Sequence, residues 1–298
     1  MVVLVTGAGG QLGQAIKFVG SEYHHIDFHF AGSSELDITD IDNVNSVFSH
    51  ITPDFCINAA AYTAVDKAES EPEKARLINV DGAKNVALAC KQFNTTLIHI
   101  STDFVFDGTS NRPYTEEDIP NPTSVYGKTK LEGERAIAEV WHKHFIIRTS
   151  WLYSQFGNNF MKTMLRLAAE RDSLSVVNDQ IGTPTNAVDL AEAILKIVQL
   201  LNSKIQIPNS KDPAPNTLNP APYGVYHFSN EGQCSWFDFA KKIFEVNNVK
   251  IAVHAIPTSS FPTAARRPGY SVLDKGKIKV VPGIAVRSWE DALKGVNA

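Results

Sequence analysis

The sequence predicts an α/β fold: a doubly wound parallel sheet joined to a smaller α/β domain. Strand-like and helix-like segments alternate through the first half of the chain, which is the pattern of a parallel sheet with helices on both faces. The second half is less regular. We therefore expect residues 1–150 plus about 186–230 to form the larger domain, and about 151–185 plus 231–298 to form the smaller one.

The expected strands of the sheet are short apolar runs, most of them rich in β-branched residues, as buried strands are. The run at 25–30 alternates polar and apolar residues instead. The predicted strands are residues 1–6, 25–30, 55–58, 96–100, 144–150 and 225–228.

Helices are expected where apolar residues recur at helical spacing. They cover residues 72–93, 157–171 and 186–201. Ser235 is of a type that caps helices, and a last short helix is expected from about Ser288. Residues 202–224 contain five prolines, which predicts an exposed loop.

The composition of the chain does not point to nucleic acid or a membrane as a partner. The chain has 298 residues, enough for a sizeable core, and a net charge of −4, which does not indicate nucleic acid or an anionic membrane as a partner. No apolar run reaches the length of a membrane span, and no signal peptide precedes the first strand. The three cysteines lack metal-ligand spacing, so we expect a cytoplasmic protein.

A glycine loop follows the first strand directly. Gly7, Gly10 and Gly13 lie between that strand and a helical pattern. Strand, glycine loop and helix are the context of a dinucleotide-binding, Rossmann-type unit, in which the pyrophosphate lies at the helix N-terminus. The alternative is a glycine-rich turn without a ligand.

Tyr126 and Lys130 are four residues apart. On a helix this spacing places both side chains on one face. A neighbouring ammonium lowers the pKa of a phenol, and a proton donor works best with a pKa near the working pH. The pair predicts a proton donor, and the alternative is an exposed pair on a helix surface.

Ordered motifs along the chain resemble the dTDP-4-dehydrorhamnose reductases, a family of extended short-chain dehydrogenases/reductases. The resemblance covers nearly the whole chain apart from residues 202–224 and the C-terminus. The matching motifs are residues 6–13, 58–69, 101–108, 125–134, 148–153, 157–160, 178–185 and 267–268.

The resemblance implies an oxidoreductase that transfers a hydride from a nicotinamide to C4 of dTDP-4-dehydro-L-rhamnose. The product would be dTDP-L-rhamnose, a precursor of cell-surface polysaccharide. Tyr126 would donate the proton, Lys130 would lower the pKa of Tyr126 and hold the nicotinamide ribose, and Thr102 would hold the substrate oxygen. Asp103 would tune the proton donor. Thr102 as a strand-end residue and Asp103 as a turn carboxylate are the alternatives.

The residue after Asp103 separates reduction from dehydration. Related sugar-nucleotide dehydratases carry an acidic pair after this threonine, whereas Phe104 follows Asp103 here. This favours plain reduction. The alternatives are an NAD-dependent sugar-nucleotide epimerase or dehydratase, and a non-catalytic regulatory subunit that binds NADP.

The resemblance also implies a set of cofactor contacts. Strand two is followed by Ser33 and Ser34 and not by the acidic residue typical of NAD enzymes, which favours NADPH, with NADH as the alternative. The implied contacts are Gly10, Gln11 and Leu12 at the diphosphate, Asp37 and Ile38 at the adenine, and Ala59, Ala60, Ala61 and Thr63 at the nicotinamide half.

For the substrate, Trp151 would cover the deoxysugar, with a core aromatic residue as the alternative. Arg267 would pair with the diphosphate, although Arg266 beside it is an equal candidate. The preference for thymine over uracil rests on the resemblance alone. The remaining implied contacts are Asn158, Asn159, Asp179, Gln180 and Thr185.

Some family members dimerise through a magnesium ion held by acidic residues. Ala15 and Val188 stand at the matching positions here, which argues against that interface metal. Monomer and homodimer both stay open.

Overall fold

The computed structural model of the protein describes residues 1–205 and 222–296. Most of the predicted loop at 202–224 lies outside the described residues. Its first residues, 202–205, are not a loop, because they continue helix α8 (Ala187–Ile205).

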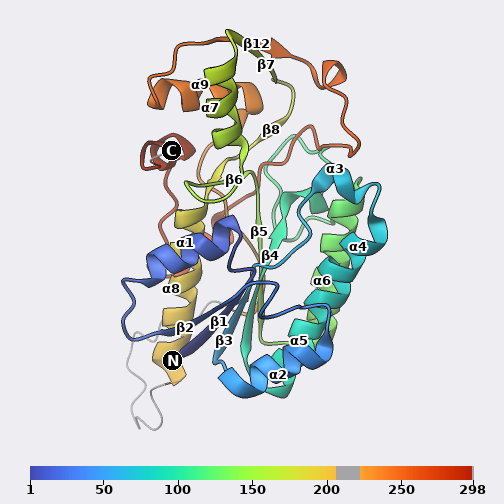
Figure 1. Cartoon of the computed structure of the whole chain (residues 1–298), viewed down its shortest axis with the longest axis vertical. Helices are drawn as coiled ribbons and strands as arrows, with labels where there is room; N and C mark the ends of the chain where they lie inside the picture. Colours follow the sequence, from blue (N-terminus) through green and yellow to red (C-terminus); the bar gives the residue numbers. More distant parts are fainter. Residues whose placement is uncertain (206–221, 297–298) are drawn as a thin grey trace.

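The centre of the fold is a six-stranded parallel sheet with the strand order β10-β5-β4-β3-β1-β2 (Figure 1). The chain passes from β1 to β2 in one direction and from β3 to β5 in the other, so the order reverses at β1. Ligands of such sheets bind at the carboxyl ends of the strands near this reversal. The strands are β1 (Val2–Thr6), β2 (Asp27–Ala31), β3 (Phe55–Asn58), β4 (Thr96–Thr102), β5 (His144–Thr149) and β10 (Gly224–His227).

Helices cover both faces of the sheet, as predicted (Figure 1). α1 (Gln11–Gly20) and α8 pack on one face, while α2 (Ile41–Ile51), α5 (Ala83–Gln92) and α6 (Val125–Val140) pack on the other. Neighbouring residues of one strand, such as Ile57 and Cys56, enter opposite cores, because side chains alternate along a strand.

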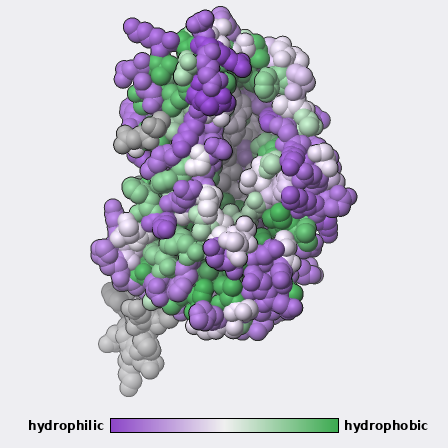
Figure 2. Space-filling model, viewed as in Figure 1, coloured by the Kyte–Doolittle hydropathy of each residue, from purple (hydrophilic) through white to green (hydrophobic). Residues whose placement is uncertain are grey.

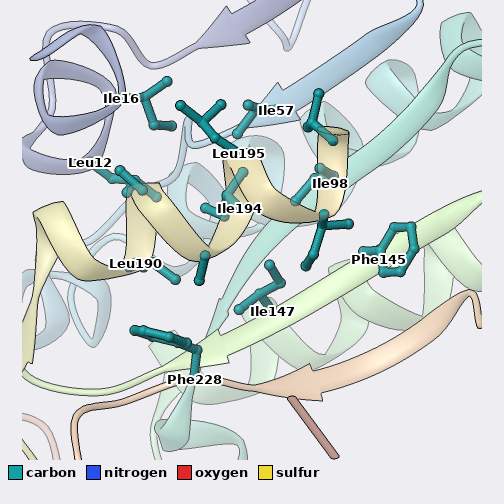
Figure 3. Close-up of a cluster of buried hydrophobic side chains, with 14 of the residues drawn as sticks. Leu12, Ile16, Ile57, Ile98, Phe145, Ile147, Leu190, Ile194, Leu195 and Phe228 are labelled. Carbon is teal, nitrogen blue, oxygen red and sulfur yellow. The ribbon is translucent and has the colours of Figure 1, made fainter. Parts of the chain in front are cut away.

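The core beneath α8 shows why this helix forms where it does. Its apolar residues recur at helical spacing and meet the β-branched residues of the sheet (Figure 3). Each fully buried leucine or isoleucine contributes roughly 1.5–3 kcal/mol. The labelled side chains of this cluster are Leu12, Ile16, Ile57, Ile98, Phe145, Ile147, Leu190, Ile194, Leu195 and Phe228.

The helix predicted at 72–93 contains an irregular middle. α4 (Pro72–Arg76) passes into a π-helical segment, η1 (Leu77–Gly82), before α5 begins. Within this segment Asn79 is buried, and its Oδ1 accepts from the backbone N–H of Tyr62 at 2.8 Å. Its Nδ2 lies 3.1 Å from Thr129 Oγ1 on α6. The irregular turn therefore connects α6 to the segment that follows β3.

A second lobe with its own core lies beyond the carboxyl ends of the strands (Figure 1). Ser235 caps α9 in a capping box with Asp238, as predicted, and Ser288 caps α11, the short helix that was expected from about this residue. The lobe consists of α7 (Phe160–Glu170), β7 (Ser173–Val177), α9 (Trp236–Val246), β12 (Ala252–Ile256) and α11 (Trp289–Lys294).

The remaining elements are short. Among them, α10 (Gly276–Lys279) places Ile278 in the core between α8 and the sheet. The others are α3 (Val65–Ala68), η2 (Asp103–Val105), β6 (Leu152–Tyr153), β8 (Ile181–Gly182), β9 (Thr185–Asn186), β11 (Cys234–Ser235) and η3 (Thr258–Ser260).

Hydrophilic and hydrophobic residues are interspersed over the face of the molecule in Figure 2. In the part of the chain that the structure describes, no helix combines the length and the apolar character needed to cross a membrane.

Candidate active site

The glycine loop between β1 and α1 forms a cradle that side chains would fill. Gly7 has φ +65°, and a Cβ there would lie 2.6 Å from the backbone nitrogen of Ala60. A Cβ on Gly13 would lie 2.6 Å from Ala8 Cα. Gly10 caps α1 without a side-chain hydrogen bond, and no acidic residue occupies the first turn. The first N–H groups of α1 therefore suit an anion such as a pyrophosphate.

Tyr126 lies in the first turn of α6, which Ser124 begins by accepting from the N–H of Gly127 at 3.1 Å. The Thr102 hydroxyl at the end of β4 lies beside the Tyr126 side chain, close enough to influence its pKa. Burial raises the pKa of Tyr126 to about 12, the Thr102 hydroxyl lowers it and the negative charge of Asp103 raises it further. The structure thus brings the predicted proton donor and the predicted oxygen-holding residue together.

Asp103 is a buried carboxyl beside this pair. Its Oδ1 accepts from the Thr102 hydroxyl at 3.0 Å, while Oδ2 is buried without a hydrogen-bond partner among the described residues. Burial raises its pKa to about 6, against the lowering influence of the Ser271 and Thr102 hydroxyls. Asp103 is therefore ionised near neutral pH and becomes protonated in mild acid.

Lys130 is buried on the same helix, and its amine is directed at β4. Its Nζ donates to the Ile100 carbonyl at 2.7 Å and lies 3.2 Å from His99 Nε2. Burial lowers the pKa of Lys130 to about 8, although Glu134 raises it. Desolvation therefore governs both partners of the predicted pair.

A buried polar chain beneath Lys130 was not anticipated from the sequence. Asn58 Nδ2 lies 3.1 Å from His99 Nδ1, and Thr6 Oγ1 donates to Asn58 Oδ1 at 2.6 Å. The signal in the sequence is a polar side chain within each of two buried strands, Asn58 at the end of β3 and His99 in the middle of β4.

A buried ion pair fixes α6 against the sheet. Arg148 Nη2 on β5 lies 2.7 Å from Glu134 Oε2, and both side chains are 4% exposed. Ser101, one residue before Thr102, donates to Glu134 Oε1. The position of Glu134, four residues after Lys130 on the same helix face, is the only sequence signal for this clamp.

The residues expected around the cofactor are spread along the same sheet edge. Ala59 and Ala60 approach Gly7 closely. The Leu12 side chain is buried in the core, and Gln11 Oε1 accepts from Asn159 Nδ2 at 3.0 Å, so only their backbones face the loop. The others are the half-buried Ala61, the exposed Thr63 and Asp37, and Ile38, which is buried against Gly82.

Glu35 is an acidic residue shortly after β2 that was not among the predicted site residues. Its Oε2 accepts from the N–H of Gly32 at 2.8 Å, just after β2. This is the position near which dinucleotide-binding folds of this kind carry the acid that contacts the ribose.

Trp151, the aromatic residue expected over the deoxysugar, stacks on a second tryptophan. Trp151 has φ +46°, and its ring stacks on Trp236 at a centroid distance of 3.5 Å and an interplanar angle of 9°. Gly182 lies against the indole, where a Cβ would come within 2.5 Å of Trp151 Cε2. The half-buried Trp151 thus belongs to the aromatic packing of the second lobe, with one part still accessible.

Several predicted substrate contacts already have partners. Arg267 forms a bidentate pair with Asp66, with N–O distances of 2.8 and 3.1 Å, whereas Arg266 is exposed. Asn158 is also exposed. The others are Asn159, which caps α7, Asp179 and Gln180, which bind Thr258, and Thr185, which meets Thr149.

In residues 1–205 and 222–296, no group of three or more His, Cys, Asp or Glu side chains is placed to hold a metal ion. Ala15 is buried in the main core and Val188 packs against it.

The chain is similar to proteins of one family throughout its length. The family described as RmlD substrate binding domain matches residues 1–298. A dTDP-4-dehydrorhamnose reductase from Aggregatibacter actinomycetemcomitans is 43% identical, over 99% of this chain and 98% of that protein. Solved structures include the reductase from Clostridium acetobutylicum, with a TM-score of 0.89 at 41% identity, covering 99% and 97% of the two chains. Another, from Bacillus anthracis in complex with NADP, has a TM-score of 0.87 at 41% identity, covering 98% and 97%.

Proposed function

Because the chain belongs to the dTDP-4-dehydrorhamnose reductase family, we propose that it reduces the C4 ketone of dTDP-4-dehydro-L-rhamnose to dTDP-L-rhamnose. The observation that carries this proposal is the meeting of Tyr126 and Thr102 at the sheet edge that also holds the glycine cradle. The reaction belongs to the synthesis of dTDP-rhamnose for polysaccharide.

NADPH supplies the hydride when it is bound. The negative charge that develops on the former ketone oxygen needs a hydrogen-bond donor and then a proton. A phenol with a pKa of about 12 is protonated at neutral pH, so Tyr126 has a proton to give. The Thr102 hydroxyl beside Tyr126 would hold the ketone oxygen in the same place.

The cofactor fits the glycine cradle because the N–H groups at the start of α1 have no competing side chain. Gly7, Gly10 and Gly13 would hold the diphosphate, together with the backbones of Gln11 and Leu12. NADPH is the cofactor, with NADH as the second choice. The adenine and nicotinamide contacts proposed are Asp37, Ile38, Ala59, Ala60, Ala61, Thr63, Tyr126 and Lys130.

The partner of the site is a dTDP-sugar. Trp151 and Asn158 are proposed to contact it, because both keep accessible surface. An arginine is proposed at the diphosphate, and the exposure of Arg266 and the pairing of Arg267 with Asp66 support Arg266 over Arg267. Asp103, Asn159, Gln180 and Thr185 complete the proposed substrate set.

The second lobe would supply these substrate contacts, which is the reason to propose two domains. Residues 1–150 plus about 186–230 would bind the cofactor, and about 151–185 plus 231–298 the sugar nucleotide. A cytoplasmic location is proposed from the three cysteines, which are buried free thiols. Monomer and homodimer are both compatible with the proposal.

The experiment is to mix the purified chain with NADPH and dTDP-4-dehydro-L-rhamnose, and to follow NADPH absorbance and the sugar product together. The proposal expects one NADPH oxidised for each dTDP-L-rhamnose formed. An epimerase or dehydratase would retain NAD⁺ and show no net oxidation. A regulatory subunit would bind NADPH without oxidising it, and either result would overturn the reductase.

A further inference from the structure

Trp151, which is proposed to cover the deoxysugar, lies just beyond the end of β5 at the carboxyl edge of the sheet. Thr149, the last residue of β5, is the strand partner of Thr102 on β4. Trp151 is therefore close in the fold to the residue proposed to hold the ketone oxygen. The direction of its indole decides the shape of the sugar site, so the contacts that fix this direction have consequences for binding.

The backbone of Trp151 adopts a conformation that bulky residues rarely adopt. Its φ of +46° lies in the left-handed region. The N–H of Thr185 donates to its carbonyl at 3.2 Å, and β6, which starts at the next residue, pairs with β9. Such conformations persist only where surrounding contacts hold them, and they are common at functional sites. The position of Trp151 is therefore imposed by its neighbours in the fold and not by a local preference of the chain.

Two contacts of the Trp151 indole come from one small sheet. β8 and β11 pair antiparallel, with Cys234 opposite Gly182. Gly182 leaves room for the indole, because a Cβ there would lie 2.5 Å from Trp151 Cε2. Trp236 begins α9 directly after β11, and its ring stacks on the indole at a centroid distance of 3.5 Å. One pair of strands therefore supplies both the space for the indole and the ring that holds it.

Trp236 has a fixed position of its own. Ser235 and Asp238 form the capping box that begins α9, with the N–H of Asp238 donating to Ser235 Oγ at 3.0 Å. The ring centroid of Phe160 on α7 lies 4.6 Å from that of Trp236. Both stacked tryptophans are only half-buried. The pair therefore keeps accessible apolar surface, and the methyl group of a deoxysugar suits such a surface.

We propose that Trp236 is a positioning residue of the reductase: by stacking on Trp151, it holds the indole in the direction in which it covers the deoxysugar. The inference rests on the proposed function, because it places a dTDP-sugar at this edge of the sheet. Trp236 acts through Trp151 and not on the nucleotide. Its loss should therefore weaken the binding of the sugar ring and leave the binding of dTDP and NADPH in place.

The first arm of the test measures the binding of dTDP-L-rhamnose, dTDP and NADPH by calorimetry in the unsubstituted protein and in Trp236→Leu. The variant should bind dTDP-L-rhamnose about tenfold more weakly, since an aromatic stack contributes on this order. Its affinities for dTDP and NADPH should stay within about twofold. Phe237→Leu is the matched control, because Phe237 is the next residue of α9 and its ring lies under Lys241 at 5.3 Å. Equal losses for all three ligands, no loss, or the same selective loss in the control would overturn the inference.

The second arm asks whether Trp236 acts through Trp151. In a Trp151→Leu background, Trp236→Leu should weaken dTDP-L-rhamnose binding hardly further, since two residues that act as a unit are not additive. Trp236→Phe keeps an aromatic ring and should recover most of the affinity. Gly182→Ala leaves Trp236 in place but displaces the indole, so it should show the same selective loss even if Trp236→Leu does not fold. Additive losses, or full affinity in Gly182→Ala, would contradict the inference.

The third arm is turnover of dTDP-4-dehydro-L-rhamnose with NADPH, in which Trp236→Leu should raise the KM for the sugar more than it lowers kcat. If the chain oxidises no NADPH while both binding arms hold, only the proposed reductase fails. If turnover is present and the selective loss is absent, only the role of Trp236 is lost. An unsubstituted chain that neither oxidises NADPH nor binds dTDP-L-rhamnose would overturn both.

Discussion

The carboxyl edge of the sheet buries ionisable side chains, whereas the second lobe buries mainly aromatic ones. At the edge, Asp103 and Lys130 are buried, and burial moves the pKa of each toward neutrality, to about 6 and about 8. In the second lobe the buried contacts are mainly aromatic, such as Phe239 against Phe160 at 5.6 Å. The edge therefore carries groups poised to exchange protons at a cost in stability, and the second lobe is built for packing.

The variant Tyr126→Phe should show the largest effect of this difference between the two regions. Removing the proton donor should lower kcat by about 10²- to 10⁴-fold, because a positioned acid contributes on this order. The free energy of unfolding should change little, since the ring and its contact with Phe104 stay in place. Steady-state kinetics and urea unfolding measure the two effects. Tyr223→Phe, at an exposed tyrosine, is the control, and undiminished turnover in Tyr126→Phe would refute the assignment.

The opposite result is expected from Phe239→Ala in the second lobe. Phe239 is fully buried in that core. Its truncation should lower the free energy of unfolding by about 3–5 kcal/mol, while folded molecules keep their NADPH binding. Thermal unfolding and NADPH titration test this. Phe261→Ala, at a side chain that is 57% exposed, should change stability by less than about 0.5 kcal/mol. Equal losses in both variants would contradict the packing role.

Asp103→Asn should make the protein more stable in a pH-dependent way. The pKa of Asp103 is raised from 3.8 to about 6 in the folded chain, so ionisation costs stability as the pH rises through this range. The variant should gain at most about 3 kcal/mol above pH 6 and almost nothing below pH 4. Urea unfolding at several pH values measures this. A gain independent of pH would show that the carboxylate charge is not the cause.

The smallest effect is expected at Glu35, beyond the buried part of the edge. Glu35→Gln removes a negative charge next to the predicted ribose position and should raise the NADPH to NADH ratio of kcat/KM by about fivefold or less. Glu22→Gln, at an exposed residue just after α1, is the matched control. If the NADPH to NADH ratio falls in Glu35→Gln, the Glu35 carboxylate does not lie next to the ribose of the cofactor.

Much of the sheet was predictable because its strands are short apolar runs and its helices carry apolar stripes. β3 was predicted to the residue, and Ser235 and Ser288 cap the helices expected after them. The π-helical turn at residues 77–82 was not predicted, because the apolar stripe of the helix continues through it. The short strands of the second lobe were missed, since they pair across long stretches of sequence.

The candidate site also contains residues that the sequence predicted and contacts that it did not. Tyr126 and Thr102 were proposed from local motifs, and they lie together because the end of β4 and the first turn of α6 meet at the sheet edge. The direction of the Lys130 amine depends on His99 and Ile100, which spacing on α6 does not reveal. The partner of Arg267, Asp66, is 201 residues away in sequence. Contacts of this kind follow from the assembled fold and not from any local pattern.

The most direct test of the account is the fate of the transferred hydrogen. NADPH deuterated at the transferring position of C4 is incubated with the chain and dTDP-4-dehydro-L-rhamnose, and the product is analysed by NMR and mass spectrometry. Ketone reduction predicts one deuterium at C4 of dTDP-L-rhamnose for each NADPH consumed. A sugar product without deuterium at C4, or NADPH that stays unconsumed, would contradict the reductase.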